Sequence, residues 1–121
     1  MNNFINVSLF IRSIDPQNGD ISFVLLKDKD TYTLPTQRLA TMCSRENAIM
    51  LAQKYISVPM SWYNIVPFSF YDIDSNIYLV YLINTSINIA FKNGAKIYTY
   101  EELSKIDANK FHKLLPAVLS S

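Results

Sequence analysis

The sequence predicts one domain of the α/β (α+β) class, in which helices pack against a β-sheet. Three observations carry this prediction. Half of the 121 residues are hydrophobic, which is enough for a real core. Runs typical of strands and helices follow one another in the order β-β-β-α-β-β-β-α-α. Neither a linker nor an internal repeat interrupts them, so we expect a single domain over residues 1–121.

Two strand-like runs open the chain, and a turn joins them. The first, Phe4 to Ile14, alternates apolar and polar residues over its second half. The second, Ile21 to Leu26, is almost continuously apolar, as in a strand buried on both faces, so we expect it near the centre of the sheet. The segment 15–20 between them contains Pro16 and the pair Asn18-Gly19, which is a hairpin signal.

The first helix follows a turn of alternating charge at residues 27–30. It is expected to begin at Ser44, whose hydroxyl would cap the free amides of the first turn. Ala48, Ala52 and Ile56 would share one face. Because the helix is apolar over most of its circumference, we expect it to be covered on both sides.

Two more strands, Ile65 to Tyr71 and Asn76 to Asn84, are predicted around residues 72–75, and the second is apolar enough to be central. Asp72 and Asp74 would point the same way from a strand and so could hold a cation. Aspartate is favoured in turns by its bonds to its own backbone, and we interpret this segment as a hairpin turn.

The C-terminal part is predicted to contain two helices. Thr99 and Glu102 fit a capping box, which gives Glu102 a structural role. Asp107 is expected to cap the last helix, and Pro116 predicts that this helix kinks or stops near Leu115. The apolar stripe of the last helix consists of Phe111, Leu114, Leu115, Val118 and Leu119.

Composition narrows the function classes. A formal net charge of +1 argues against a broad nucleic-acid-binding surface. The single cysteine, Cys43, excludes an internal disulfide and favours a reducing compartment. Since we find no secretion signal and no apolar run near the roughly 20 residues of a membrane span, we expect a soluble, cytoplasmic protein. The excess of Asn, Ile, Tyr, Ser and Lys is typical of AT-rich coding sequences, as in low-GC bacteria, phages and large viruses.

The stretch from Leu34 to Val58 resembles the Nudix box of the Nudix hydrolase family. It reads Leu-Pro-Thr-Gln, a short loop, and then a helical run from Ser44. The family has here the pattern G-x5-E-x7-R-E-U-x-E-E-x-G-U, usually after Leu-Pro. Its glutamates hold divalent cations, which need oxygen ligands, and glutamates three and four apart share one helix face. Residues 96–103 are similar to a strand and helix start found late in Nudix domains. The resemblance implies a Nudix-like α/β/α sandwich with a mixed sheet.

The acids of that pattern are missing in both possible registers. Without a gap after Pro35, the four glutamate positions fall on Cys43, Ala52, Tyr55 and Ile56. The arginine position then falls on Leu51 and the glycine position on Gln37. With one residue fewer in the loop, the four glutamate positions fall on Met42, Leu51, Lys54 and Tyr55. The arginine position then falls on Met50 and the glycine position on Thr36. The resemblance therefore implies a degenerate box without catalytic residues. We expect no metal ion and no cofactor to be bound there.

Three functions stay open. The first is a catalytically inactive Nudix-fold domain that serves as an interaction or assembly module for a protein or, within a ribonucleoprotein complex, for RNA. The second is a sensor that binds a nucleotide or nucleotide sugar without cleaving it, in a pocket formed by Tyr32, Arg38, Tyr63 and Phe70. The third is a divergent metal-dependent pyrophosphohydrolase with acids from elsewhere, such as Asp72, Asp74 or Glu101.

Other residues that suggest chemistry have simpler interpretations. His112, the only histidine, lacks neighbours at metal-ligand spacing, and we predict it on the solvated surface. Cys43 has no visible base, which favours a buried or incidental thiol. Trp62, Phe70 and their aromatic neighbours could stack bases. Few Lys or Arg lie between residues 60 and 84, so we predict that these aromatics pack in the protein.

Overall fold

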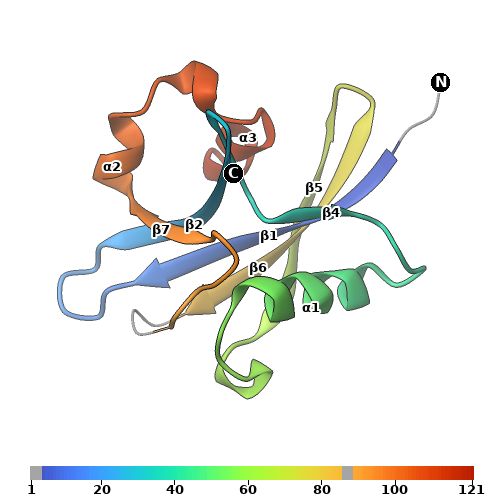
Figure 1. The fold of residues 1–121 in the computed structure, drawn as a ribbon, viewed down its shortest axis with the longest axis horizontal. Coiled ribbons are helices and arrows are strands. Elements are labelled where there is room, and N and C mark those ends of the chain that lie inside the picture. Colours follow the sequence, from blue (N-terminus) through green and yellow to red (C-terminus); the bar gives the residue numbers. More distant parts are fainter. Residues whose placement is uncertain (1–3, 86–88) are drawn as a thin grey trace.

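The computed structural model describes residues 4–85 and 89–121, which fold around a mixed β-sheet (Figure 1). Its strands are β1 (Phe4–Ile14), β2 (Ile21–Asp28), β3 (Thr31–Thr33), β4 (Thr36–Arg38), β5 (Ile65–Ile73), β6 (Asn76–Thr85) and β7 (Lys96–Thr99). Its helices are α1 (Ser44–Tyr55), α2 (Tyr100–Ser104) and α3 (Leu114–Leu119), with 3₁₀ turns η1 (Met60–Trp62) and η2 (Ala108–Lys110). None of these helices is long and apolar enough to span a membrane.

The strand order β3-β2-β1-β6-β5 confirms the predicted mixed sheet, with β4 also paired to β1 and β7 to β2. The strands β1 and β6 run parallel, from Phe4 opposite Asn76 to Ser13 opposite Thr85. The other pairings between named strands are antiparallel. As predicted, β2 and β6 have neighbours on both sides.

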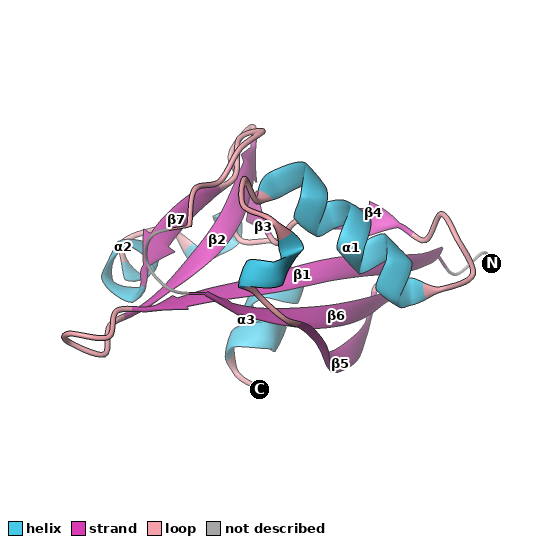
Figure 2. Cartoon of the chain, turned by 90° about the horizontal axis from the view of Figure 1, so that it is seen from below, coloured by secondary structure: helices cyan, strands magenta, loops and turns pink. Residues whose placement is uncertain are grey.

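Helices cover both faces of the sheet, with α1 on one face and α3 on the other (Figure 2). Since side chains alternate along a strand, β1 contributes to two apolar clusters. Val7, Leu9 and Ile11 pack with α1, whereas Phe10 packs with α3. The alternation predicted for β1 does not produce a solvent-exposed face, because Ser8 and Phe10 are buried as well. The α/β/α layering is confirmed.

The predicted turns are present. Gly19 has a φ of +75° between β1 and β2, a conformation that glycine adopts without strain. Asp74 and Ser75 both have positive φ between β5 and β6, as a tight hairpin turn requires. The Asp74 carboxylate accepts a hydrogen bond of 2.8 Å from Lys113 Nζ. The hairpin interpretation of residues 72–75 is therefore confirmed.

The start of α1 is confirmed at Ser44, but the predicted cap is wrong. Cys43 occupies the capping position, and no side chain bonds to the free amides there. Ser44 has already entered the helix, and its hydroxyl lies 2.6 Å from the hydroxyl of Tyr81 on β6. The hydrogen bond with Tyr81 therefore uses the Ser44 hydroxyl that was predicted to cap the helix.

At the C-terminal end, the capping box of α2 is confirmed by two reciprocal bonds of 3.1 Å between Thr99 and Glu102. Asp107 does not cap the last helix, because its carboxylate accepts a bond from the backbone N–H of Asn109 in η2. The predicted stop at Pro116 is also wrong. Proline lies in the first turn of α3, where amides have no intrahelical partner, so the helix continues to Leu119.

Candidate functional site

The inner face of α1 carries most of the positions at which the resemblance predicts glutamates. In the register without a gap, Ala52, Tyr55 and Ile56 all lie in the apolar cluster beneath the helix, together with Leu51. Ala52 is completely inaccessible to solvent. The helix forms this face because its apolar residues recur three and four apart. This part of the helix belongs to the core.

The shorter register gives a similar picture. Met42 is fully exposed, and Met50 and Lys54 are also exposed, while Leu51 and Tyr55 stay buried. The Lys54 ammonium lies 5.3 Å from the centroid of the Tyr55 ring, so a cation occupies the side where a metal ion would need anions.

The two residues at the turn-glycine position both make internal hydrogen bonds. Thr36 Oγ1 donates to the carbonyl of Leu34 and lies 2.7 Å from the hydroxyl of Ser8. Gln37 Nε2 donates to the side chain of Asn47 over 2.9 Å. Both side chains therefore serve the structure of this segment.

Acids from elsewhere are not assembled into a metal site. Within residues 4–85 and 89–121, no three His, Cys, Asp or Glu side chains gather in a group that could hold a metal ion. Asp74 is paired with Lys113, and Glu101 lies 3.5 Å from Lys105, its neighbour one helical turn away. Asp72 is exposed on β5. Asp74 and Glu101 thus each form a separate local ion pair.

The residue that organises the loop before α1 is Asn47, which the sequence analysis did not single out. It is completely buried. Its Oδ1 accepts hydrogen bonds from the backbone N–H of Ala40 at 2.8 Å and from Gln37. Its Nδ2 donates to the carbonyl of Cys43 at 2.8 Å and to Thr41 Oγ1 at 3.0 Å. One amide group therefore fixes the whole loop to the helix.

Arg45 ties the start of α1 to the edge of the sheet. Its guanidinium donates a hydrogen bond of 2.5 Å to the backbone carbonyl of Ile65, the first residue of β5. Together with the contact between Ser44 and Tyr81, this bond fixes the helix over β5 and β6. No local sequence pattern signals either contact, because each joins residues that are distant in the chain.

The four residues predicted to line a nucleotide pocket lie in different places. Tyr32 packs edge-on against Tyr98 with the α3 cluster, whereas Tyr63 belongs to the α1 cluster on the opposite face of the sheet. Phe70 is 70% exposed on β5. Arg38 lies at the end of β4, with its guanidinium carbon 3.6 Å from the centroid of the Phe4 ring. The fold does not bring these side chains together.

Two of the aromatic residues predicted to pack are exposed instead. Trp62 is 66% exposed and Phe70 protrudes from β5, because β5 lies at the edge of the sheet and has only β6 as a neighbour. Tyr63 is buried as predicted, and burial raises the pKa of its phenol. Its hydroxyl has no hydrogen-bond partner within the described part of the chain. Cys43 is exposed, which rules out the buried one of the two predicted alternatives, a buried or an incidental thiol.

His112 is half-buried, which corrects its predicted place on the solvated surface. Its ring packs edge-on against Tyr78, with centroids 5.6 Å apart. Nδ1 accepts a hydrogen bond of 3.1 Å from the backbone N–H of Leu114, at the start of α3. Burial lowers the pKa of His112, with Asp74 opposing the shift and Lys113 adding to it. The neutral imidazole is therefore a structural element of the α3 face.

Comparison with solved structures identifies the fold. The Ap4A hydrolase of C. elegans superposes with a TM-score of 0.69 at 16% identity, over 98% of this chain and 95% of the hydrolase. The NUDIX domain of Shewanella oneidensis NrtR, in complex with ADP ribose, gives a TM-score of 0.68 at 8% identity, over 99% and 88% of the two chains. The chain has a Nudix-like fold.

A third similar structure is the C-terminal domain of mouse MUTYH in its complex with human PCNA. It superposes with a TM-score of 0.70 at 14% identity, over 98% of this chain and 86% of that domain. Neither a protein-family model nor a curated protein matches the sequence. At these identities, the likeness concerns the Nudix-like fold alone.

Proposed function

We propose that this chain is a catalytically inactive Nudix-fold domain that acts as an interaction module for a partner protein. One observation carries the proposal: the helix that would supply the metal-binding glutamates buries Ala52, Tyr55 and Ile56 in the core. In the other register, Leu51 and Tyr55 are the buried ones.

The physical reason for inactivity is the lack of ligands for a divalent cation. Metal-assisted hydrolysis of a pyrophosphate requires the cation to polarise phosphate oxygens and activate water, and carboxylates must hold it in place. An isolated carboxylate is strongly disfavoured in an apolar interior such as the one around Ala52. The face of α1 that packs on the sheet therefore cannot also bind a cation, because the carboxylates that hold the cation would be buried in the apolar core.

The edge of the sheet supports a role in binding a protein. Trp62, Val66 and Phe70, which we call the edge surface, are exposed on and just before β5. This strand ends the sheet order, so its outer backbone groups are available for a strand of another protein. The MUTYH domain, which is similar in structure, is in complex with the protein PCNA. A small fold of this kind can therefore serve in protein binding.

The first experiment tests inactivity. The purified chain is incubated with Mg²⁺ or Mn²⁺ and a panel containing ADP ribose, diadenosine tetraphosphate and nucleotide sugars, with a box-intact Nudix hydrolase as the positive control. We expect no turnover above the protein-free background. Metal-dependent turnover that persists through repeated purification would overturn the inactive assignment.

The second experiment tests the interaction. The tagged chain is isolated gently from its source cells, after cross-linking, as the wild type and as the double variant Trp62→Ser and Phe70→Ser. Met42→Ser serves as the matched control, because Met42 is an exposed apolar residue outside the edge surface. We expect a stoichiometric protein partner with the wild type and the control, and its loss with the double variant. Recovery of the wild type alone would contradict the proposal.

A further inference from the structure

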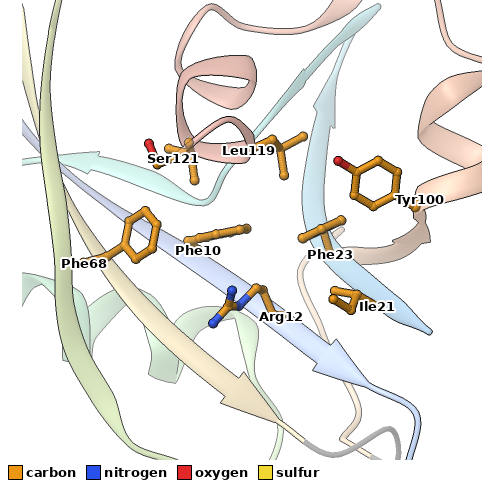
Figure 3. A pocket seen from close by; sticks show the side chains of 9 residues that line it. Phe10, Arg12, Ile21, Phe23, Phe68, Tyr100, Leu119 and Ser121 are labelled. Carbon is orange, nitrogen blue, oxygen red and sulfur yellow. The ribbon is translucent and has the colours of Figure 1, made fainter. Parts of the chain in front are cut away.

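An aromatic pocket opens on the α3 face of the sheet, beside the C-terminal end of α3 (Figure 3). Its volume is about 170 Å³. We call it the α3-side pocket and define it by Phe10, Phe23, Phe68, Tyr100 and Arg12. Leu119 and Ser121, at the end of the chain, form its upper rim in the figure.

The rings of the pocket hold one another in place. Phe10 on β1 and Phe23 on β2 lie stacked, with centroids 5.6 Å apart and planes 13° apart. Phe68 on β5 meets Phe10 edge-on at 5.4 Å, and Tyr100 at the start of α2 meets Phe23 edge-on at 5.6 Å. Rings from four elements thus form a fixed apolar floor, which α3 leaves open because it ends at Leu119. A preformed pocket lowers the entropy cost of binding.

The size of the pocket selects one aromatic side chain. An apolar cavity of about 150 Å³ in a protein core is known to accept benzene. A volume of about 170 Å³ therefore has room for one six-membered ring and little more. Edge-on or offset contacts with Phe68 and Tyr100, the two more accessible rings of the pocket, would stabilise the inserted ring.

Arg12 gives the pocket its charge. Its Nε donates a hydrogen bond of 3.1 Å to Oδ1 of Asn84, and its guanidinium carbon lies 5.5 Å from the centroid of Phe10. Within the described part of the chain, its two terminal nitrogens have no hydrogen-bond partner and no carboxylate lies within ion-pair distance. The guanidinium is thus oriented at the rim of an apolar pocket, ready to bind a carboxylate with two parallel bonds.

We propose that the α3-side pocket binds a segment of a partner protein that inserts one aromatic side chain between Phe68 and Tyr100, above the buried rings of Phe10 and Phe23, and places an adjacent Asp or Glu on Arg12. The inference rests on the proposed interaction role, and it assigns a site other than the edge surface. Such short segments bind through one buried aromatic anchor and one oriented polar contact.

The charges around the pocket favour a peptide over a single-stranded nucleic acid, which aromatic rings on a sheet can also bind. Among the described residues that line the pocket, Arg12 has the only charged side chain. The adjoining pocket shares Ile21 and Tyr100 with it and is lined by the acids Asp20 and Glu101. A phosphate backbone carries a charge at every nucleotide and would meet these carboxylates, whereas a peptide can place a single acid on Arg12.

The test is a selection of displayed random heptapeptides on the full chain, followed by affinity measurements on the enriched peptides. Three variants are compared: Arg12→Gln, Tyr100→Ala and Arg38→Gln. Tyr100 is exposed, so its loss leaves the core intact. Arg38 is the matched control, because it also lies over a phenylalanine ring but belongs to β4. Circular dichroism and thermal unfolding confirm that each variant is folded.

We expect the enriched peptides to share an aromatic residue next to Asp or Glu. The Kd should rise about tenfold or more with Arg12→Gln, since a charged hydrogen bond is lost, and at least about fivefold with Tyr100→Ala. With Arg38→Gln it should change by less than about twofold. Replacement of the peptide's Asp or Glu by Lys should raise the Kd for the wild type. The same replacement should change the Kd for the Arg12→Gln variant little.

Three results would overturn the inference: no enrichment, enriched peptides without an acid, or peptide binding that Arg12→Gln leaves unchanged. Competition by oligothymidylate at equal or lower concentration would show a nucleic-acid site instead. The partner from source cells separates the two proposals. If the edge-surface variant loses that partner but Arg12→Gln retains it and no peptide is selected, the pocket inference fails and the interaction role stands. If the wild type has no partner, the interaction role itself fails.

Discussion

Replacement of Asn47 by alanine should destabilise the domain more than any exposed substitution in the same region. The side chain is completely buried and joins the loop before α1 to the helix through five hydrogen bonds, one each with Ala40, Gln37 and Cys43 and two with Thr41. Alanine removes both the donor and the acceptor. The backbone N–H of Ala40 would then lose its acceptor, whereas the carbonyl of Cys43 would keep two donors, Thr41 Oγ1 and the backbone N–H of residue 47.

The magnitude follows from the number of bonds. A typical internal hydrogen bond contributes about 1 kcal/mol net, and a buried group left unsatisfied costs about 1–3 kcal/mol. Gln37 and Thr41 can turn toward water, so their bonds cost less. We therefore expect Asn47→Ala to lower the free energy of unfolding by about 3–4 kcal/mol. With about 4 °C per kcal/mol for a domain of this size, the Tm should fall by about 12–16 °C.

Urea unfolding followed by circular dichroism measures the change, and differential scanning calorimetry gives the Tm. Asn109→Ala is the matched control, because Asn109 is exposed in η2, and its free energy of unfolding should change by less than about 0.5 kcal/mol. A loss below about 1 kcal/mol for Asn47→Ala would refute the reasoning. It would mean that the loop before α1 keeps its conformation without this side chain.

Three further predictions concern other parts of the chain. Ala52→Glu should lower the free energy of unfolding by at least about 3 kcal/mol, because it buries a carboxylate, and it should restore no hydrolysis. Lys54→Glu, at an exposed position of the same helix, should change the free energy of unfolding by less than about 1 kcal/mol. Urea titrations compare the two variants, and equal stability would contradict the buried position of Ala52. Burial lowers the pKa of His112 in the folded chain below its ordinary 6.5, so the unfolded chain binds more protons near this pH. The free energy of unfolding should therefore fall as the pH drops through about 6.5. It should level off once the pH is below the pKa of His112 in the folded chain. His112→Asn, which keeps an acceptor for the Leu114 amide, should flatten this dependence between pH 7.5 and 5, and an unchanged slope would assign it to other groups. Thr99→Ala should cost about 1 kcal/mol through loss of the capping box, measured by thermal unfolding, and no change would show that α2 depends on its tertiary contacts alone.

Local patterns predicted the elements of the fold well where the residues that decide them are neighbours in sequence. The Asn18-Gly19 turn, the capping box of Thr99 and Glu102, and the start of α1 at Ser44 all depend on a few adjacent residues. The mixed sheet with helices on both faces was predicted from the resemblance to Nudix domains, to which the order of strands and helices contributes.

The predictions failed where a distant residue decides the outcome. His112 is half-buried because Tyr78, 34 positions away, packs against it, and Ser44 does not cap α1 because Tyr81 holds its hydroxyl. The exposure of Phe70 follows from the place of β5 at the edge of the sheet, which no local pattern encodes. The α3-side pocket likewise requires rings from four separate elements.

The parallel pairing of β1 with β6 has a consequence for the synthesis of the chain. Arg12 and Asn84 face each other in this pairing although 72 positions separate them. At about 5–20 residues per second, the first strand leaves the ribosome roughly 4–15 s before the strand that completes its environment. During that interval, β1 has apolar residues on both faces and half of its backbone groups unpaired, so it is a natural binding segment for chaperones. The strand at the centre of the finished sheet is thus made early and completed only when β6 has been synthesised.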